Sequence, residues 1–144
     1  MPYSTWLRFK LMAGTATATQ TIALNVDYRS ALGRTAPIAG QLVVVFIAPP
    51  WGDALDPASG LDLRRTYPPI PEIANRLSTH FAHNPILFVI QVHESVNEAS
   101  LNEVAATFEW SSLEIYDLLA QGNNHGILLA TRRWRPEGNG ETES

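Results

Sequence analysis

The sequence contains no cysteine, a single lysine and no long apolar run. Without cysteine the chain forms neither a disulfide framework nor a thiolate metal site, which favours a cytoplasmic setting. The longest apolar run, 42–50, is far shorter than the roughly 20 residues that a membrane-spanning helix needs. The first residues lack the charged start and apolar stretch of a secretory signal. We therefore expect a cytoplasmic protein with no membrane partner.

Charged residues are also scarce. They make up 17% of the chain against 45% hydrophobic residues, and the formal net charge is −4. This composition supports a folded core. Nucleic-acid binding would need a local basic patch, because the molecule as a whole does not attract phosphate. The 144 residues fit one domain, which we expect over 1–135, followed by a disordered polar tail over 136–144.

Apolar strands alternate with amphipathic segments along the chain. We expect strands at 21–28, 41–48, 86–94, 111–119 and 125–134, and helices at 71–81 and 97–108. The strands 41–48 and 86–94 are continuously apolar, which predicts burial on both faces, as in a parallel sheet. Strand–helix–strand order favours parallel strands with right-handed crossovers, so we expect an α/β fold.

The motif Ala48-Pro49-Pro50-Trp51 lies where the first continuously apolar strand ends. Ligands of parallel α/β sheets bind beyond the carboxyl ends of the strands. The prolines fix φ and keep the corner rigid. Trp51 is therefore a candidate for stacking on a flat ligand; the alternative is a loop tryptophan that packs over the sheet edge.

Four segments, "VVFIAPPWGD", "LDLRRT", "NPILFVIQVHES" and "GILLATRRW", together resemble the C-terminal half of a class I S-adenosylmethionine-dependent methyltransferase. More narrowly, they look like the trimethylguanosine synthases, which methylate the exocyclic 2-amino group of a 7-methylguanosine RNA cap. The resemblance runs over about 43–134. It implies a partial Rossmann-like methyltransferase sheet, mostly parallel, with a C-terminal antiparallel hairpin. It also implies S-adenosylmethionine as cofactor, with no metal.

The resemblance assigns catalytic roles to Ala48, Pro49, Pro50 and Trp51. Trp51 would stack on a guanine-like base, while the carbonyl groups of Ala48 and Pro49 would face the amino group of that base. The family carries an acidic, amide or hydroxyl residue at the first of these positions, whereas Ala48 has no side-chain acceptor. Because positioning and electrostatics carry most of this type of catalysis, the departure puts activity in doubt.

For the cofactor, the resemblance requires a glycine-rich turn after one strand and an acid after the next. Gly14 and Asp27 are the residues that can stand in for them. The interval from Gly14 to Pro49 has room for about one strand–helix–strand unit, which takes ~30 residues or more, whereas the family needs three crossovers there. Either the N-terminal half is shortened, or another chain supplies it, or cofactor binding is lost.

Three further residues near the motif are candidates for substrate binding: Asp53, Arg64 and Arg65. The two arginines suit a clamp on a substrate phosphate, or they pair with nearby acids. For Asp53, loop solvation or helix capping is the favoured alternative. The segment "RRWR" at 132–135 is of the kind that holds RNA, or it is a plain strand end with one buried aromatic residue.

Two hypotheses follow. In the first, the chain is an N-methyltransferase that acts on a guanine-like base in RNA or a nucleotide, alone or with a partner chain that completes the sheet. In the second, it is a catalytically inactive methyltransferase-like module for binding or dimerisation, in which an open sheet edge pairs with a second copy.

Overall fold

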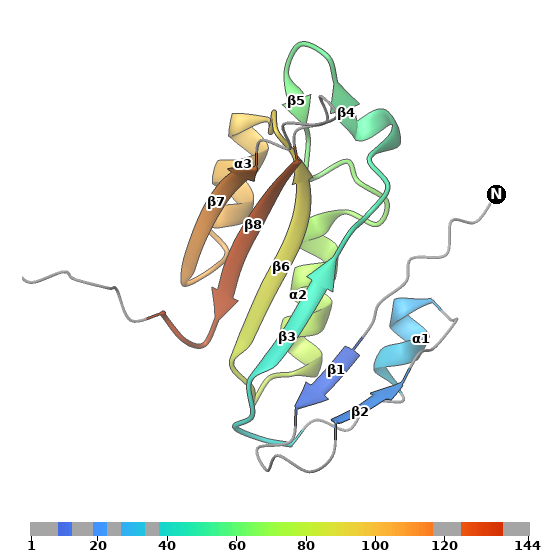
Figure 1. The fold of residues 1–144 in the computed structure, drawn as a ribbon, viewed down its shortest axis with the longest axis vertical. Helices are drawn as coiled ribbons and strands as arrows, with labels where there is room; N and C mark the ends of the chain where they lie inside the picture. The colour runs from blue at the N-terminus through green and yellow to red at the C-terminus, as the bar shows by residue number, and fades with distance from the viewer. Residues whose placement is uncertain (1–8, 13–18, 23–26, 34–37, 117–124, 137–144) are drawn as a thin grey trace, which may run out of the picture.

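The computed structural model describes residues 9–12, 19–22, 27–33, 38–116 and 125–136, which form one mixed sheet and three helices (Figure 1). The strands of the sheet are β1 (Phe9–Met12), β2 (Thr19–Ile22), β3 (Val43–Ile47), β6 (Ile86–His93), β7 (Trp110–Tyr116) and β8 (His125–Arg132). The helices are α1 (Tyr28–Leu32), α2 (Ile70–His80) and α3 (Glu98–Ala105). A single 3-10 turn, η1 (Gly52–Ala54), precedes a small hairpin of β4 (Leu55–Asp56) and β5 (Gly60–Leu61).

The strand order in the sheet is β2-β1-β3-β6-β8-β7. The α/β class and the closing antiparallel hairpin are confirmed, but the prediction of a mostly parallel sheet is wrong for the described strands. Only β3 and β6 pair in parallel, and every other neighbouring pair is antiparallel. The reason is that α2 is the one described helix that connects two strands adjacent in the sheet. After α3, the chain forms β7 and returns as β8, which takes the place next to β6.

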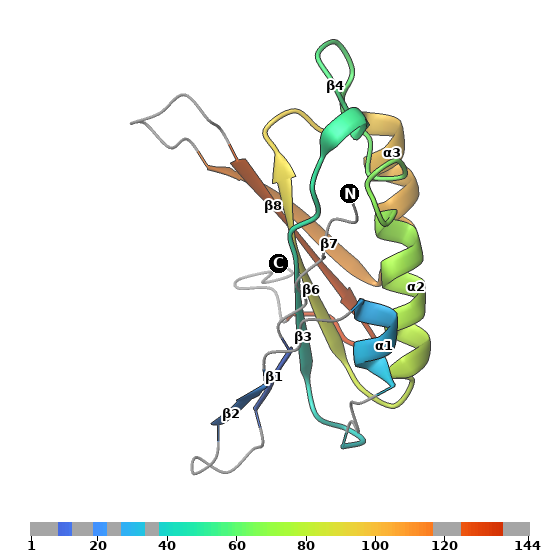
Figure 2. The same cartoon turned by 90° about the vertical axis from the view of Figure 1, so that its right-hand side faces the viewer.

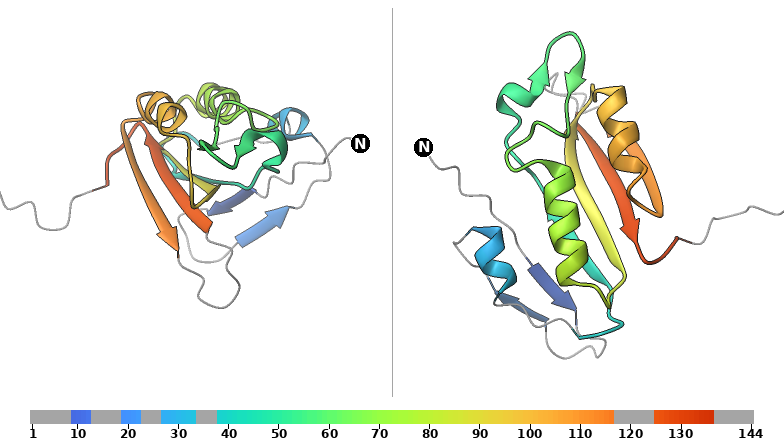
Figure 3. Two further views of the ribbon diagram at one scale, coloured as in Figure 1. Left: turned by 90° about the horizontal axis from the view of Figure 1, so that it is seen from above. Right: turned by 180° about the vertical axis from the view of Figure 1, so that it is seen from behind.

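The helices cover one face of the sheet. Figure 2 shows α1, α2 and α3 on the same side, and the views in Figure 3 agree. In β3, Val45 and Ile47 are buried beneath the helices, whereas Val44 and Phe46 are 40% and 48% exposed. The predicted burial of this strand on both faces is therefore wrong, because no described element covers the second face.

The core lies between α2 and the three central strands. The buried residues of α2 follow the spacing of an amphipathic helix: Ile70, Ile73, Ala74 and Leu77. They belong to the same apolar cluster as the buried face of the central strands, which includes Val45, Phe88, Ile90 and Leu128. Burying each large side chain contributes about 1.5–3 kcal/mol. The helix predicted at 71–81 is confirmed, with Pro71 in its first turn.

The strand predicted over 21–28 is wrong at its C-terminal end. The strand β2 ends at Ile22, and Tyr28 begins α1. Asp27 caps this helix, because its carboxylate accepts a hydrogen bond from the backbone N–H of Arg29 at 2.8 Å. Gly14 and all but the first residue of the tail predicted over 136–144 lie outside the described residues.

Candidate functional site

The segment between β3 and α2 is tied to the turn that joins β6 to α3. The backbone N–H of Leu61 donates to the carbonyl of Ser95 at 2.8 Å, and that of Asn97 donates to the carbonyl of Leu61 at the same distance. Leu61 and Leu63 are fully buried. The sequence predicts a long polar loop here, but the segment forms the β4–β5 hairpin and contributes to the core.

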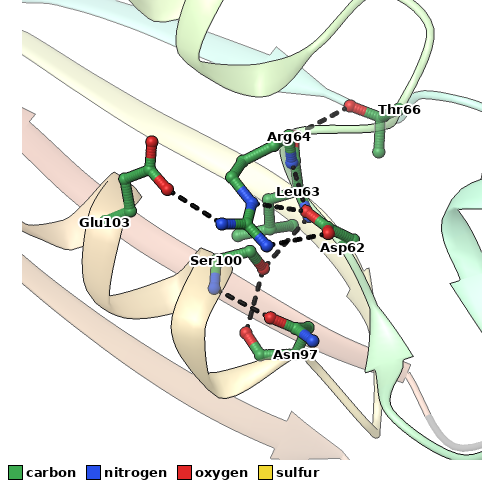
Figure 4. Close-up of polar contacts among 7 residues, drawn as sticks. All are labelled: Asp62, Leu63, Arg64, Thr66, Asn97, Ser100 and Glu103. Carbon is green, nitrogen blue, oxygen red and sulfur yellow. Dashed lines mark hydrogen bonds and ion pairs between the residues drawn. The ribbon is translucent and has the colours of Figure 1, made fainter.

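Figure 4 shows the polar contacts that hold this segment against α3. The side chain of Asn97 caps α3 by accepting a hydrogen bond from the backbone N–H of Ser100 at 2.9 Å. The Ser100 hydroxyl donates to the carbonyl of Asn97 at 2.9 Å and accepts from the backbone N–H of Leu63 at 3.2 Å. Ser100 is completely buried, so these bonds fix the position of the segment.

Arg64 is already paired within the protein. Its guanidinium donates to both carboxylate oxygens of Asp62 and to Glu103, each at 3.0 Å (Figure 4). The hydrogen bond from Arg64 holds the pKa of Asp62 below its usual range. A substrate phosphate at Arg64 would have to compete with two carboxylates. Its predicted role in substrate binding stays a prediction.

Arg65 and Asp53 are both exposed. The Arg65 guanidinium makes no hydrogen bond or ion pair with the described part of the chain, so it is the more available of the two neighbouring arginines. Asp53 lies in the first turn of η1. The structure leaves the predicted roles of both residues untested.

Gly60 permits the close approach of β5 to the turn after β6. Its φ is +88°, and a Cβ atom there would lie 2.8 Å from both the carbonyl oxygen and the hydroxyl of Ser95. Gly40 has a similar φ of +83°, but a Cβ atom there would meet nothing within 4 Å. Both glycines therefore need a positive φ, but only at Gly60 would a side chain collide with a neighbouring residue.

We expect Gly60→Ala to lower the free energy of unfolding by about 2–3 kcal/mol. The alanine would be strained in the left-handed backbone conformation, and its Cβ atom would also force Ser95 to move. Gly40→Ala would bring the same backbone strain without a close contact, so it should lower the free energy of unfolding by about 1 kcal/mol. Urea unfolding of both variants measures the difference. Equal losses in the two variants would show that the contact with Ser95 does not constrain the segment.

Trp51 lies at the carboxyl edge of the sheet with two histidines. Its ring centroid is 5.4 Å from that of His93 and 5.7 Å from that of His125. The indole plane is inclined to the imidazole planes by 88° and 41°, so neither histidine stacks parallel on it. Trp51 is half-buried and packs partly against the core. Two imidazole rings and the core thus contact Trp51, and part of the residue remains accessible.

The two histidines face each other across neighbouring strands. His93 in β6 and His125 in β8 are register partners, on the open face of the sheet. The Nδ1 atom of His93 accepts a hydrogen bond from the backbone N–H of Ser95 at 3.0 Å, which leaves its Nε2 as the protonated nitrogen of the neutral ring. The Nδ1 atom of His125 is buried without a hydrogen-bond partner among the described residues. We name Trp51, His93 and His125 the edge cluster.

The other residues of the proline motif lie beside the edge cluster. Pro49 is buried, whereas Ala48 and Pro50 are exposed. The carbonyl of Trp51 accepts a hydrogen bond from the backbone N–H of Ala54 at 2.9 Å, which folds the chain into η1 directly after the motif. The predicted catalytic roles of Ala48, Pro49, Pro50 and Trp51 remain predictions.

Of the two residues predicted to bind S-adenosylmethionine, Gly14 and Asp27, the structure describes only Asp27. Asp27, the predicted ribose-binding acid, uses its carboxylate to cap α1. Figure 1 shows this helix beside β1 and β2, away from η1 and the β4–β5 hairpin. Gly14 lies outside the described residues. The structure therefore does not bring Asp27 together with the edge cluster.

The basic segment 132–135 makes bonds within the protein. The Arg133 guanidinium donates to the carbonyls of Asn84 and Phe81, at 2.6 and 2.7 Å, and the Trp134 indole N–H donates to the carbonyl of Ile86 at 3.0 Å. Arg132 lies over the ring of Phe108, 5.2 Å from its centroid, and burial lowers the pKa of this arginine. These contacts favour the structural interpretation of the segment over RNA binding.

Comparison of the chain with family models, curated proteins and solved structures found no match. None of the described helices has both the length and the apolar character required to cross a membrane. Within the described ranges, no three histidine, aspartate or glutamate side chains come together as metal ligands would.

Proposed function

We propose that the chain is a methyltransferase-like module that binds a planar, guanine-like base of RNA or a nucleotide against Trp51. The observation that carries this proposal is the position of Trp51. It follows a rigid double-proline corner at the carboxyl edge of the parallel pair β3 and β6, where His93 and His125 hold its ring. Ligand sites in α/β sheets occur at such edges.

The element order supports the methyltransferase part of the proposal. β3, the proline motif, α2, β6, α3 and the β7–β8 hairpin follow one another as the resemblance implies. The pairing of β3 with β6 is parallel, and the hairpin closes the sheet next to β6. These features concern the segment 43–134, which is the part that carries the resemblance.

Two observations favour binding over independent methyl transfer. Ala48 brings no side-chain acceptor to the amino group of a base, although its exposed position at the strand end would allow one. The carboxylate of Asp27 is engaged in capping α1 instead of lying at the edge cluster. The function that we propose for the chain alone is therefore recognition of the base.

Stacking on the indole is the main contribution that we expect to binding. A base stacked on an aromatic side chain gains about 1–3 kcal/mol. The ring of Trp51 is rigidly held, so little rotamer freedom is lost when a base covers its accessible part. Of the imidazole nitrogens in the edge cluster, Nδ1 of His93 already accepts from Ser95 and Nδ1 of His125 is buried, so hydrogen bonds to a base would involve the Nε2 atoms.

Trp51→Ala should weaken binding of guanosine or 7-methylguanosine monophosphate by about 10–100-fold, because the stacking contribution disappears. Trp51→Phe keeps an aromatic face and should lose much less. Calorimetric titration measures both. Tyr67→Ala is the matched control, since Tyr67 is an aromatic residue that is 71% exposed and makes no ring contact with Trp51.

Wild-type protein that shows no nucleotide binding at millimolar concentration would overturn the proposal, as would equal affinities for wild type and Trp51→Ala. A parallel titration with S-adenosylmethionine separates the two hypotheses. Absence of binding heat supports a recognition module, whereas clear binding supports the enzyme.

A further inference from the structure

The uncovered face of the sheet carries a continuous apolar surface. Six side chains from three adjacent strands form it, and we name them the open-face block: Val44, Phe46, Leu87, Val89, Ile127 and Leu129. The strand register places Phe46, Val89 and Leu129 in one row across the sheet. Figure 2 shows that all three helices lie on the opposite side.

Apolar residues occupy both faces of these strands, which is the pattern of a sheet that is packed against other elements on both faces. A sheet with one wet face alternates apolar and polar residues along each strand. In β3 and the first half of β6, instead, every residue on either face is apolar. The composition of the strands thus matches a second covering layer, and the described helices supply only the first.

The size of the open-face block fits a protein interface. Phe46 is 48% exposed and Val44 is 40% exposed, while the other four side chains are half-buried. Together they expose on the order of 300 Å² of apolar surface, which is the size of the largest patch on a typical monomer, and such patches are often functional. A standard interface buries about 800 Å² per partner, and a little over half of that area is apolar.

The charges on this face permit self-association. Along β3, β6, β7 and β8, which are fully described, Glu114 is the one residue with a formal charge whose position lies on the open face. Two copies of a chain with net charge −4 would repel each other through most surfaces. The open-face block brings few charges together, and two sheets can pack face to face about 10 Å apart.

We propose that the open-face block is a homodimer interface, in which two copies of the chain pack sheet against sheet and bury Phe46, the most exposed side chain of the block. This is contact between two faces, whereas the sequence predicts pairing of sheet edges. The edge of β3 is not free, because β1 pairs with it at Phe9 and Val45. The interface does not depend on base binding at the edge cluster.

Sedimentation equilibrium tests the interface with the full chain. We expect a dimer with a dissociation constant in the micromolar range, as for a standard interface without charged contacts. Phe46→Glu introduces one charge from each copy into the contact and should weaken the dimer by at least about thirtyfold. Tyr67→Glu introduces the same charge at a side chain that is 71% exposed and lies between β5 and α2, outside the open-face block. This variant should leave the dimer unchanged.

A cross-link provides a second measurement that does not rely on a disruptive charge. The chain has no cysteine, so Phe46→Cys introduces a single thiol. A bismaleimide reagent with a reach of about 10 Å, the spacing of packed sheets, should link two copies of this variant efficiently. Tyr67→Cys is the control and should link poorly under the same conditions.

A wild-type chain that stays monomeric at several hundred micromolar would overturn the proposal and leave the face to a different partner. A dimer that tolerates Phe46→Glu, in protein shown by circular dichroism to be folded, would place the interface elsewhere. Equal cross-linking of the variants at positions 46 and 67 would have the same meaning.

Discussion

Phe88→Ala should lower the free energy of unfolding by about 3–5 kcal/mol, which is the largest effect that we expect from a single substitution. Phe88 lies in the middle of β6, fully buried on the helix-covered face. Its ring centroid is 5.3 Å from that of Phe108, which follows α3. Removal of the ring leaves a cavity between the sheet and two helices that the surrounding strands cannot close.

Phe46→Ala is the control for this substitution. Phe46 has the same side chain on the neighbouring strand but lies on the open face, 48% exposed. Urea unfolding should be followed at low protein concentration, at which association between copies does not contribute. We expect a loss of about 1 kcal/mol or less for Phe46→Ala. Similar losses for both variants would contradict the one-sided burial of the sheet.

Arg133→Met should lower the free energy of unfolding by about 2–3 kcal/mol, because one guanidinium donates to several carbonyl groups, of which that of Phe81 also accepts from the backbone N–H of Asn84. Arg133 donates to Asn84, Phe81 and Ser78 at 2.6, 2.7 and 3.2 Å. Two of these carbonyls belong to the C-terminal end of α2, where helix carbonyls have no partner within the helix. The positive charge also faces the negative end of the helix dipole.

Two control variants separate the effect of losing these hydrogen bonds from the effect of losing a positive charge. Arg135→Met removes the same charge from an exposed residue and should change the stability by less than about 0.5 kcal/mol. Arg133→Lys keeps the charge but not the planar fork of donors, so it should recover only part of the loss. If Arg133→Met and Arg135→Met unfolded at the same urea concentration, the segment would have no capping role.

The sequence predicts the elements of the described ranges 70–116 and 125–132 well because its signals there are local. The spacing of Ile73 and Leu77, the proline in the first turn and the Asn84-Pro85 break define α2. The continuous apolar run defines β6, and the α3 region shows its helical period. Strand direction and the number of covered faces depend on contacts between distant elements. They are therefore the features that sequence patterns predicted incorrectly.

In the candidate site, too, local signals predicted some residues, and contacts between distant elements determine the others. Trp51 stands out in the sequence because prolines and a strand end flank it. His125 does not, since its place beside Trp51 depends on the register between β6 and β8. Ser100 is equally inconspicuous, because an ordinary serine in a helix gives no sign that it will bond to the backbone of Leu63. The apolar residues Leu61 and Leu63 within a polar segment were the one available signal of a buried hairpin.

Hydrogen bonds between Trp51 and Ala54, between Ala54 and Asp62, and between Leu61 and Ser95 join the indole-bearing corner to the end of β6. The backbone of this corner is therefore ordered on folding, before any ligand arrives. A ligand that meets such a preorganised surface loses little chain entropy on binding. Its association should resemble rigid docking, with similar backbone amide exchange in the corner before and after the ligand binds.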